Sequence, residues 1–362
     1  MGFDSFLGNA KAVGAVRELL ARGRMPGSLL FTGADGIGKK TLALMLAKAL
    51  NCERRGAEGD DFCGECSRCL KADEFLASSA EDLARRRAIK DAQKRVEGLL
   101  YFDLQLIEPL TRYILIEQIR QLRSTAYTRP FTFPRRVMIV DQAQAIHWQA
   151  ADLLLKVLEE PPETTTLILI CPSAYELRPT IRSRCFTLQF APVEEAVIER
   201  VLAEERGLGK RELALRVVRG SIALAKTFEL KDYLEQRKPW LALLESVARP
   251  SGRAPAPQQW KTLFDATKLL AEGGGHLEES LKTGSTLLRD LMHVLLGEEG
   301  RAVTNVDLLP RLKEWAPALG LDGIQQLEAG IESSYRQQNR NINQQLAFDS
   351  LAAEVLRSGP RT

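Results

Sequence analysis

The sequence predicts an α/β fold: a mainly parallel sheet covered by helices on both faces, followed by helical regions. Three observations predict this class. Strand-like and helix-like patterns alternate over residues 1–190. Within this region a glycine-rich stretch, GADGIGKKT, joins an apolar strand pattern to a helix pattern. After about Ala191 the strand patterns stop, and helical spacing continues toward the end of the chain.

The elements before residue 190 follow from their local patterns. AKAVGAVRELLARG has apolar residues at helical spacing and ends on Gly23, which suits a helix C-cap. KTLALMLAKALNC and residues 117–126 are also expected to be helical, and WQAADLLLKVLEEPP is a helix stopped by Pro161 and Pro162. Short apolar and β-branched runs predict strands at SLLFTG, DLQLIEP, YILI, VMIV and TTLILICP.

We expect three domains, over residues 1–190, 191–232 and 233–362. The second is a small helical unit, and the third is helical, with loops at RPSGRAPAP and EGGGH. A charged segment inside the first domain, residues 74–99, has few apolar positions and predicts a mostly solvated helix. Two interpretations stay open for this segment: a surface elaboration, or a docking surface for a partner.

Composition excludes several classes of protein. The chain has 362 residues, of which 45% are hydrophobic and 27% charged, as is typical of a soluble globular protein. Its net charge of +3 is too small to indicate a nucleic-acid binder on charge alone. No run approaches the about 18 apolar residues of a membrane helix, and MGFDSFLGNA does not resemble a secretory signal. We therefore expect a cytoplasmic protein with no membrane partner.

The stretch GADGIGKKT follows most of the phosphate-binding P-loop pattern, in which backbone N–H groups and a lysine hold phosphates. The pattern is kept by Gly33, Gly36, Gly38 and Lys39. The next position should supply a hydroxyl for Mg²⁺, but it holds Lys40, whose ammonium has no acceptor. Thr41 lies one residue further, about 100° around the helix. Two interpretations of the loop follow. It binds ATP or ADP without hydrolysing the nucleotide, or it is a turn without a ligand.

A second acidic motif strengthens the first interpretation. Four apolar residues, VMIV, end at Asp141, which suits a buried strand that presents a carboxylate to Mg²⁺. The residue that follows in ATPases of this type is usually a Glu that orients the attacking water, and here it is Gln142. An amide cannot accept the proton of that water. Together the two motifs predict a degenerate nucleotide site.

Four of the six cysteines cluster with the spacing Cys-x10-Cys-x2-Cys-x2-Cys, at Cys52, Cys63, Cys66 and Cys69. In a reducing compartment such a cluster more often binds metal than forms disulfides. Four thiolates complete a tetrahedral site with no open position, so we expect a structural Zn²⁺ rather than a catalytic one. Unligated thiols and an iron–sulfur cluster are the alternatives.

The stretch RPTIRSRC, after the strand TTLILICP, contains Arg178, Arg182 and Arg184. The pattern alone does not select one of these arginines for a function. With LLLKVLEEPPETTTLILI before it, however, TIRSRC closely resembles the clamp-loader branch of the AAA+ proteins. The cysteine module after the P-loop helix resembles the bacterial members. The resemblance covers residues 3–190 well, residues to about 232 moderately, and the last 130 or so only loosely, chiefly through NRNINQQLAFDSLAAEVL.

This resemblance implies a P-loop domain, a small helical lid and a helical collar that assembles subunits. It implies a role in DNA replication, within the complex that opens a sliding clamp and loads it on primed DNA for DNA polymerase III. Gamma/tau motor subunits and the delta subunit would be the partners. Arg184 would be an arginine finger that acts on the ATP of a neighbouring subunit, with Ser183 beside it and Cys185 as a packed residue.

Two subunit types of this family compete: an ATPase motor of the gamma/tau type, and a rigid partner that does not hydrolyse ATP. Lys40 and Gln142 favour the partner, and so does Ala223 in GSIALA, where the resemblance places the motor's sensor arginine. All three departures affect the same reaction. We therefore expect no ATPase activity from this chain by itself.

Overall fold

The computed structural model describes residues 2–56, 59–99, 102–205, 211–248, 257–272, 277–298, 300–337, 345–346, 348–350 and 352–353. The chain divides into two compact units, Met1–Glu204 with Gly220–Lys226, and Glu205–Arg219 with Thr227–Thr362. Residues 191–232, expected as a domain of their own, are shared between these units. The three-domain division stays a prediction.

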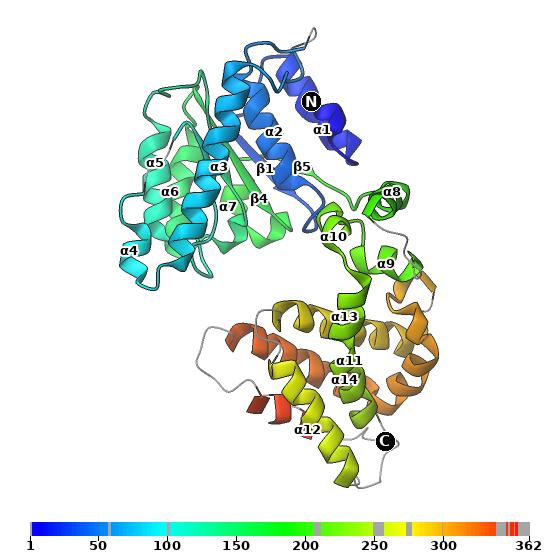
Figure 1. Cartoon of the computed structure of the whole chain (residues 1–362). Helices are drawn as coiled ribbons and strands as arrows, with labels where there is room; N and C mark the ends of the chain where they lie inside the picture. Colours follow the sequence, from blue (N-terminus) through cyan, green and yellow to red (C-terminus); the bar gives the residue numbers. More distant parts are fainter. Residues whose placement is uncertain are drawn as a thin grey trace. The chain divides into compact units, whose positions relative to one another are not determined.

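A five-stranded sheet forms the centre of the first unit (Figure 1). Its strands are β1 (Ser28–Thr32), β2 (Leu104–Ile107), β3 (Arg136–Val140), β4 (Thr165–Cys171) and β5 (Phe186–Gln189). They lie in the order β2-β3-β4-β1-β5, and every pair is parallel. All residues of β1 to β4 are buried, which explains their nearly continuous apolar sequences. The predicted α/β class is confirmed.

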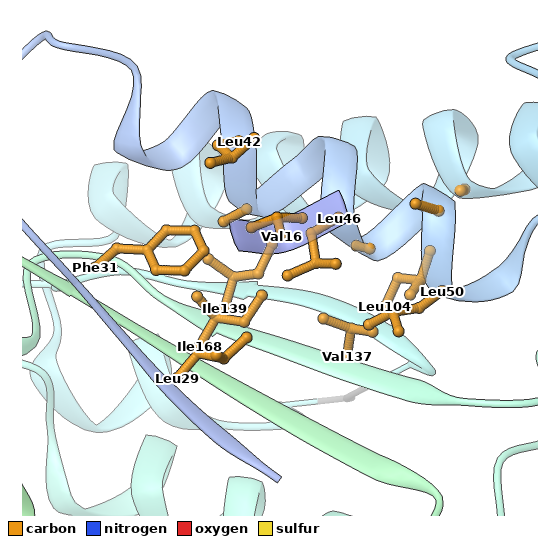
Figure 2. Packing of buried hydrophobic residues seen from close by; sticks show 14 of the residues in the cluster. Val16, Leu29, Phe31, Leu42, Leu46, Leu50, Leu104, Val137, Ile139 and Ile168 are labelled. Atoms are coloured by element: carbon orange, nitrogen blue, oxygen red, sulfur yellow. The ribbon is translucent and has the colours of Figure 1, made fainter. Parts of the chain in front are cut away.

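Helices cover both faces of this sheet. They are α1 (Ala10–Ala21), α2 (Lys39–Asn51), α3 (Ser67–Ala88), α4 (Ala92–Val96), α5 (Ile116–Ala126), α6 (Trp148–Glu159) and α7 (Pro179–Arg182). Helices α8 (Glu195–Glu205) and α10 (Ile222–Thr227) follow β5 in the chain. Side chains alternate along β1, so Leu29 and Phe31 belong to the core beneath α1 and α2, and Leu30 to the core beneath α5 and α6. Figure 2 shows the first core, where Val16 and Leu46 lie over the sheet.

Two strand predictions differ from the structure. YILI forms only an isolated bridge, between Ile114 and Ile146, and α5 begins at Ile116. Leu115 is the N-cap of α5, and its backbone N–H donates a hydrogen bond to the side chain of Gln118 at 3.0 Å. This capping interaction starts a helix where the apolar pattern predicts a strand. The strand β5 was not predicted because it lies at the sheet edge, where three of its four residues are exposed.

The charged segment, which is an insertion relative to the pattern of the family that the sequence resembles, is mostly exposed, as its composition predicts, but it does not form a single helix. It forms α3, which begins inside the cysteine cluster, and the short α4. Helix α3 buries five residues: Cys69, Ala72, Ser79, Leu83 and Arg86. The Ser79 hydroxyl lies 3.2 Å from both the N and the O of Leu106 in the edge strand β2. The insertion therefore covers a strand edge whose backbone groups would otherwise lack partners.

The second unit is helical in its described residues. Its helices are α9 (Arg211–Val218), α11 (Leu230–Val247), α12 (Pro257–Glu272), α13 (Leu277–Leu295) and α14 (Leu309–Gln337). Helices α11 to α14 share one core, which includes Trp240, Leu287 and Leu312. The loops expected at RPSGRAPAP and EGGGH, and most of the closing segment NRNINQQLAFDSLAAEVL, lie outside the described residues. None of the described helices is long and apolar enough to cross a membrane.

Candidate functional site

The glycine-rich loop has the strand–loop–helix setting that a P-loop requires. It follows β1 at Gly33 and ends where Gly38 caps the N-terminus of α2. Gly36 and Gly38 have φ angles of 75° and 101°, which favour glycine. A Cβ at Gly36 would lie 2.0 Å from Ser221 Oγ, and one at Gly38 would lie 2.7 Å from the ring of Phe6. The loop is thus packed closely by the N-terminal segment and by the residues that begin α10.

Lys39 turns back on its own loop. Its Nζ donates to the carbonyl oxygens of Gly33 and Ala34, the latter at 2.6 Å, and lies 3.5 Å from Asp35 Oδ1. The side chain is only 6% exposed. In this arrangement the ammonium satisfies loop carbonyls, so a phosphate would first have to draw it away from them.

Lys40 joins two carboxylates at the carboxyl ends of β2 and β3. Its Nζ forms an ion pair with Glu108 Oε1 and lies 3.6 Å from Asp141 Oδ2. Arg87, near the end of α3, donates to Glu108 Oε2 at 2.7 Å. Thr41, in contrast, is exposed on α2. The structure therefore brings Lys40 and Asp141 together, as parallel strand ends lead us to expect, and adds Glu108 and Arg87.

The ionisation of the two carboxylates reflects these partners. Burial alone would raise the pKa of Glu108, but the hydrogen bonds and charges of Lys40 and Arg87 outweigh burial and lower this pKa. The pKa of Asp141 is raised, first by burial and also by the charge of Glu108, with Lys40 opposing both. Lys40 thus offsets the cost of burying the negative charge more fully for Glu108 than for Asp141.

The two other positions of the degenerate motif bring no charge to the loop. Gln142 is exposed, with a φ of 55°, and its backbone N–H donates to Asp141 Oδ1 at 2.9 Å. The backbone N–H of Ala223 donates to the carbonyl of Gly36 at 3.0 Å. Position 223 therefore borders the loop, as the resemblance implies for the sensor arginine, but carries only a methyl group.

Arg184 lies at the other end of the sheet. It follows α7 and precedes β5, whose first residue pairs with Leu29 near the start of β1, whereas the glycine loop follows the end of β1. A strand rises about 3.3 Å per residue, so the two ends of β1 are about 15 Å apart. Sequence position alone does not reveal this separation; the parallel pairing of β5 with β1 does.

The guanidinium of Arg184 is held at the surface. It pairs with Glu159 Oε1 at 2.8 Å, and its Nη1 donates to the carbonyl of Thr180 at 2.9 Å and to Ser183 Oγ at 3.4 Å. Its side chain is 36% exposed. Next to it, burial raises the pKa of the Cys185 thiol to about 12, which makes this cysteine a poor nucleophile at neutral pH.

The four clustered cysteines converge on one point. Their sulfur atoms all lie within 4.8 Å of one another, with Cys52 Sγ at 3.6 Å from Cys63 Sγ and 3.9 Å from Cys66 Sγ. Metal–sulfur bonds of about 2.3 Å in a tetrahedron place sulfurs about 3.8 Å apart, whereas a disulfide needs about 2.05 Å. The cluster can therefore hold a metal ion such as zinc. Cys66 is also the N-cap of α3.

Two residues of this region, Glu108 and Arg87, were not singled out from the sequence. Glu108 carried a usable signal, because it follows the expected strand DLQLI as Asp141 follows VMIV. Arg87 lies in a run of three arginines, and nothing in the run marks it.

The family model and two curated relatives that cover most of this chain are described as DNA polymerase III subunits. The family model described as DNA polymerase III, delta subunit matches residues 8–194. The DNA polymerase III subunit delta′ of Bacillus subtilis is 26% identical over 92% of this chain and 91% of its own length. The delta′ subunit of Pseudomonas aeruginosa is 28% identical over 68% of this chain and 69% of its own length.

Similarity to a tau subunit covers less of both chains, and similarity to a solved structure is at lower identity. The tau subunit of Escherichia coli is 29% identical, but over 56% of this chain and 28% of its own length. A gamma subunit-related protein of Thermotoga maritima aligns with 96% of this chain and 99% of its own, at 16% identity and a TM-score of 0.45. Because the family model spans more than half of the chain, the chain belongs to the DNA polymerase III delta-subunit family, and among the clamp-loader proteins it is of the delta′ type.

Proposed function

We propose that this delta′-type chain hydrolyses no ATP itself and donates Arg184 to the nucleotide site of an adjacent motor subunit during clamp loading. The observation that carries the proposal is that the glycine loop and Arg184 lie at opposite ends of the sheet. At the carboxyl end, the chain's own loop has Lys40 in place of the metal-binding hydroxyl. At the amino end, Arg184 is exposed and pairs with Glu159, about one strand length from that loop.

The position of Arg184 supports action on a neighbour. An arginine finger has to reach the γ-phosphate, and Arg184 lies about one strand length from the loop of its own chain. A nucleotide bound by a second subunit, packed against the amino end of β5, would be within its reach. Arginine suits this role because its charge is permanent and its planar fork matches phosphate oxygens.

The present partner of Arg184 does not prevent such a role. Glu159 is 48% exposed, and an exposed ion pair contributes about 0–1 kcal/mol. Exchange of Glu159 for a phosphate therefore costs little. Glu159 also belongs to the LLLKVLEEPP stretch on which the family resemblance rests, so both halves of that resemblance meet at one surface point.

The proposed partners are gamma/tau motor subunits and a delta subunit, and through the assembled complex the sliding clamp and primed DNA. The proposed cellular location is the cytoplasm. The second candidate, an active gamma/tau-type ATPase, is supported by the intact Gly33, Gly36, Gly38 and Lys39, but Lys40, Gln142 and Ala223 each remove a group that hydrolysis requires.

ATP turnover tests this proposal. The isolated chain is expected to show negligible turnover, whereas the complex with its motor subunits is active. Arg184→Ala is expected to slow hydrolysis at the neighbouring site by three orders of magnitude or more, as loss of an arginine finger typically does. Arg178→Ala is the matched control, because Arg178 is an exposed arginine of the same segment, paired with Asp152. Robust turnover by the isolated chain, or equal turnover of the two variant complexes, would refute the proposal.

We also propose that the metal held by the four cysteines is zinc and that its role is structural. The complete set of four thiolates leaves no open position for a substrate. Metal analysis of the purified chain is expected to give about one zinc per chain, and Cys66→Ser to lose it. Cys185→Ser, outside the cluster, should keep the metal. A chain without bound metal would contradict this assignment.

A further inference from the structure

Four charged side chains form one group at the carboxyl ends of β2 and β3. The two carboxylates are Glu108 and Asp141, and the two cations are Lys40 and Arg87. We call them the edge cluster. Its formal charges cancel when both acids are ionised. This balance differs from that of an ordinary Mg²⁺ site, where carboxylates are left for the metal and phosphates to neutralise.

Lys40 is central to the edge cluster because its ammonium contacts both acids. It pairs with Glu108 Oε1 and lies 3.6 Å from Asp141 Oδ2. A cation that lies between two carboxylates at strand ends does electrostatically what a bound metal ion does there. It differs in being covalently attached, so no ion in solution can be exchanged for it.

The inserted helix holds this arrangement from the other side. Arg87 of α3 donates to Glu108 Oε2 at 2.7 Å and to the carbonyl of Pro109 at 3.0 Å. Each carboxylate oxygen of Glu108 is therefore bound by one cation, and the side chain is largely buried, at 11% exposure. The other end of α3 begins in the cysteine cluster. The helix thus connects the metal-binding end of the domain to the edge cluster.

We propose that Lys40 is an internal cation which, held by Glu108 and Arg87, occupies the place of a divalent ion beside Asp141 and closes the glycine loop to magnesium–nucleotide complexes. This inference deepens the proposed function, since it gives the physical reason for the absence of hydrolysis. It also assigns the insertion a role in this chain's own site. The lowered pKa of Glu108 agrees with it, because the carboxylate is stabilised in its charged form.

Binding of Mn²⁺, measured by electron paramagnetic resonance on the intact zinc-loaded chain without nucleotide, tests the inference. The wild-type chain is expected to take up no Mn²⁺ at the edge cluster. Lys40→Ser frees the two carboxylates and is expected to bind one Mn²⁺ at least tenfold more tightly than the wild type. Lys40→Arg retains a cation and should stay closed. Lys48→Ser is the matched control, because Lys48 is an ion-paired lysine of the same helix whose partner is the single carboxylate of Asp73.

The second substitution locates the gained ion. In Lys40→Ser with Asp141→Asn, the gain should disappear. The inference is overturned if Lys40→Ser gains no Mn²⁺, or if the gain survives loss of the Asp141 carboxylate. It is equally overturned if the wild-type chain binds one Mn²⁺ that Asp141→Asn removes, a result that does not depend on how any Lys40 variant folds. These outcomes are separate from failure of the proposed function, which is measured on Arg184 in the assembled complex.

Discussion

Replacement of Ser79 by alanine should loosen the outer edge of the sheet in a predictable way. Ser79 lies on the buried face of α3, and its hydroxyl forms hydrogen bonds with Leu106 and Gln105 of the edge strand β2. It donates to the carbonyl of Leu106 and accepts the N–H of the same residue, both at 3.2 Å. Alanine removes both bonds, together with the one that Gln105 Nε2 donates to the hydroxyl at 3.1 Å, and leaves the helix otherwise unchanged.

The expected cost follows from what each backbone group can find instead. A buried group left without a hydrogen bond costs about 1–3 kcal/mol. The Leu106 carbonyl has a weak second partner, Gln105 Nε2 at 3.5 Å, so the main loss is the partner of one N–H. Alanine regains about 0.5 kcal/mol of helix propensity over serine. The net cost is therefore about 1.5 kcal/mol, or roughly a tenfold change in the equilibrium between open and closed edges.

Hydrogen exchange of the peptide that covers β2 measures this change. The control is Ser78→Ala, since Ser78 is the exposed neighbour on the same helix and gains the same propensity. Protection of β2 should fall about tenfold in Ser79→Ala and stay unchanged in Ser78→Ala. Equal protection in the two variants would show that α3 does not stabilise the strand through this contact.

Three further predictions concern the metal, pH and the helical unit. Removal of zinc by a chelator, or Cys66→Ser, should lower the protection of β2 as well, because Cys66 begins the helix that covers it; hydrogen exchange with and without metal checks this. The lowered pKa of Glu108 means that its charged form stabilises the fold above its unfolded-state pKa of about 4.3, and this contribution is lost as pH falls through the lower folded-state pKa. Urea unfolding between pH 3 and 7 should therefore show a weaker loss of stability on acidification in Glu108→Gln than in the wild type. Asp290 is fully buried and accepts hydrogen bonds from the backbone N–H groups of Thr304 and Asn305. Asp290→Ala should therefore lower the free energy of unfolding of the helical unit by about 2–4 kcal/mol. The control Asp322→Asn, at an exposed position, should cause no measurable change.

The sheet was largely predictable because most of its strands are buried on both faces. VMIV and TTLILIC consist of apolar and β-branched residues with no polar interruption, and each is a strand in full. The same reasoning fails where burial is one-sided. FTLQ, at the edge, has one buried residue among four, and in YILI only Ile114 is buried while Ile116 begins a helix. An apolar sequence indicates that a segment is buried. It indicates a strand only where the buried segment also has an extended backbone.

The degenerate site was predictable in its motifs and not in its contacts. Each glycine, lysine and aspartate of the motifs is recognisable within a few residues of sequence. The partner of Lys40 is Glu108, which lies 68 residues away, and Glu108 shares Lys40 with Asp141 because β2 and β3 are neighbours in the sheet. Arg87 reaches the same carboxylate from an inserted helix. Charged residues in a sequence usually indicate a solvent-exposed face. Only the fold shows which of these residues form ion pairs.

Under the proposed function, the two ends of the sheet explain how one chain can lose one part of the ATP hydrolysis reaction and keep another. The Lys40 side chain is 39% exposed, but its partner Glu108 is only 11% exposed and is also bound by Arg87, so the carboxyl end has its charge satisfied without a ligand. Arg184 is bound by a single exposed carboxylate, which a phosphate could replace at little cost. A substitution at one end leaves the other end untouched, since the length of β1 separates them. Loss of hydrolysis at the loop therefore does not constrain the arginine, and under the proposed function the arginine alone links this chain to ATP.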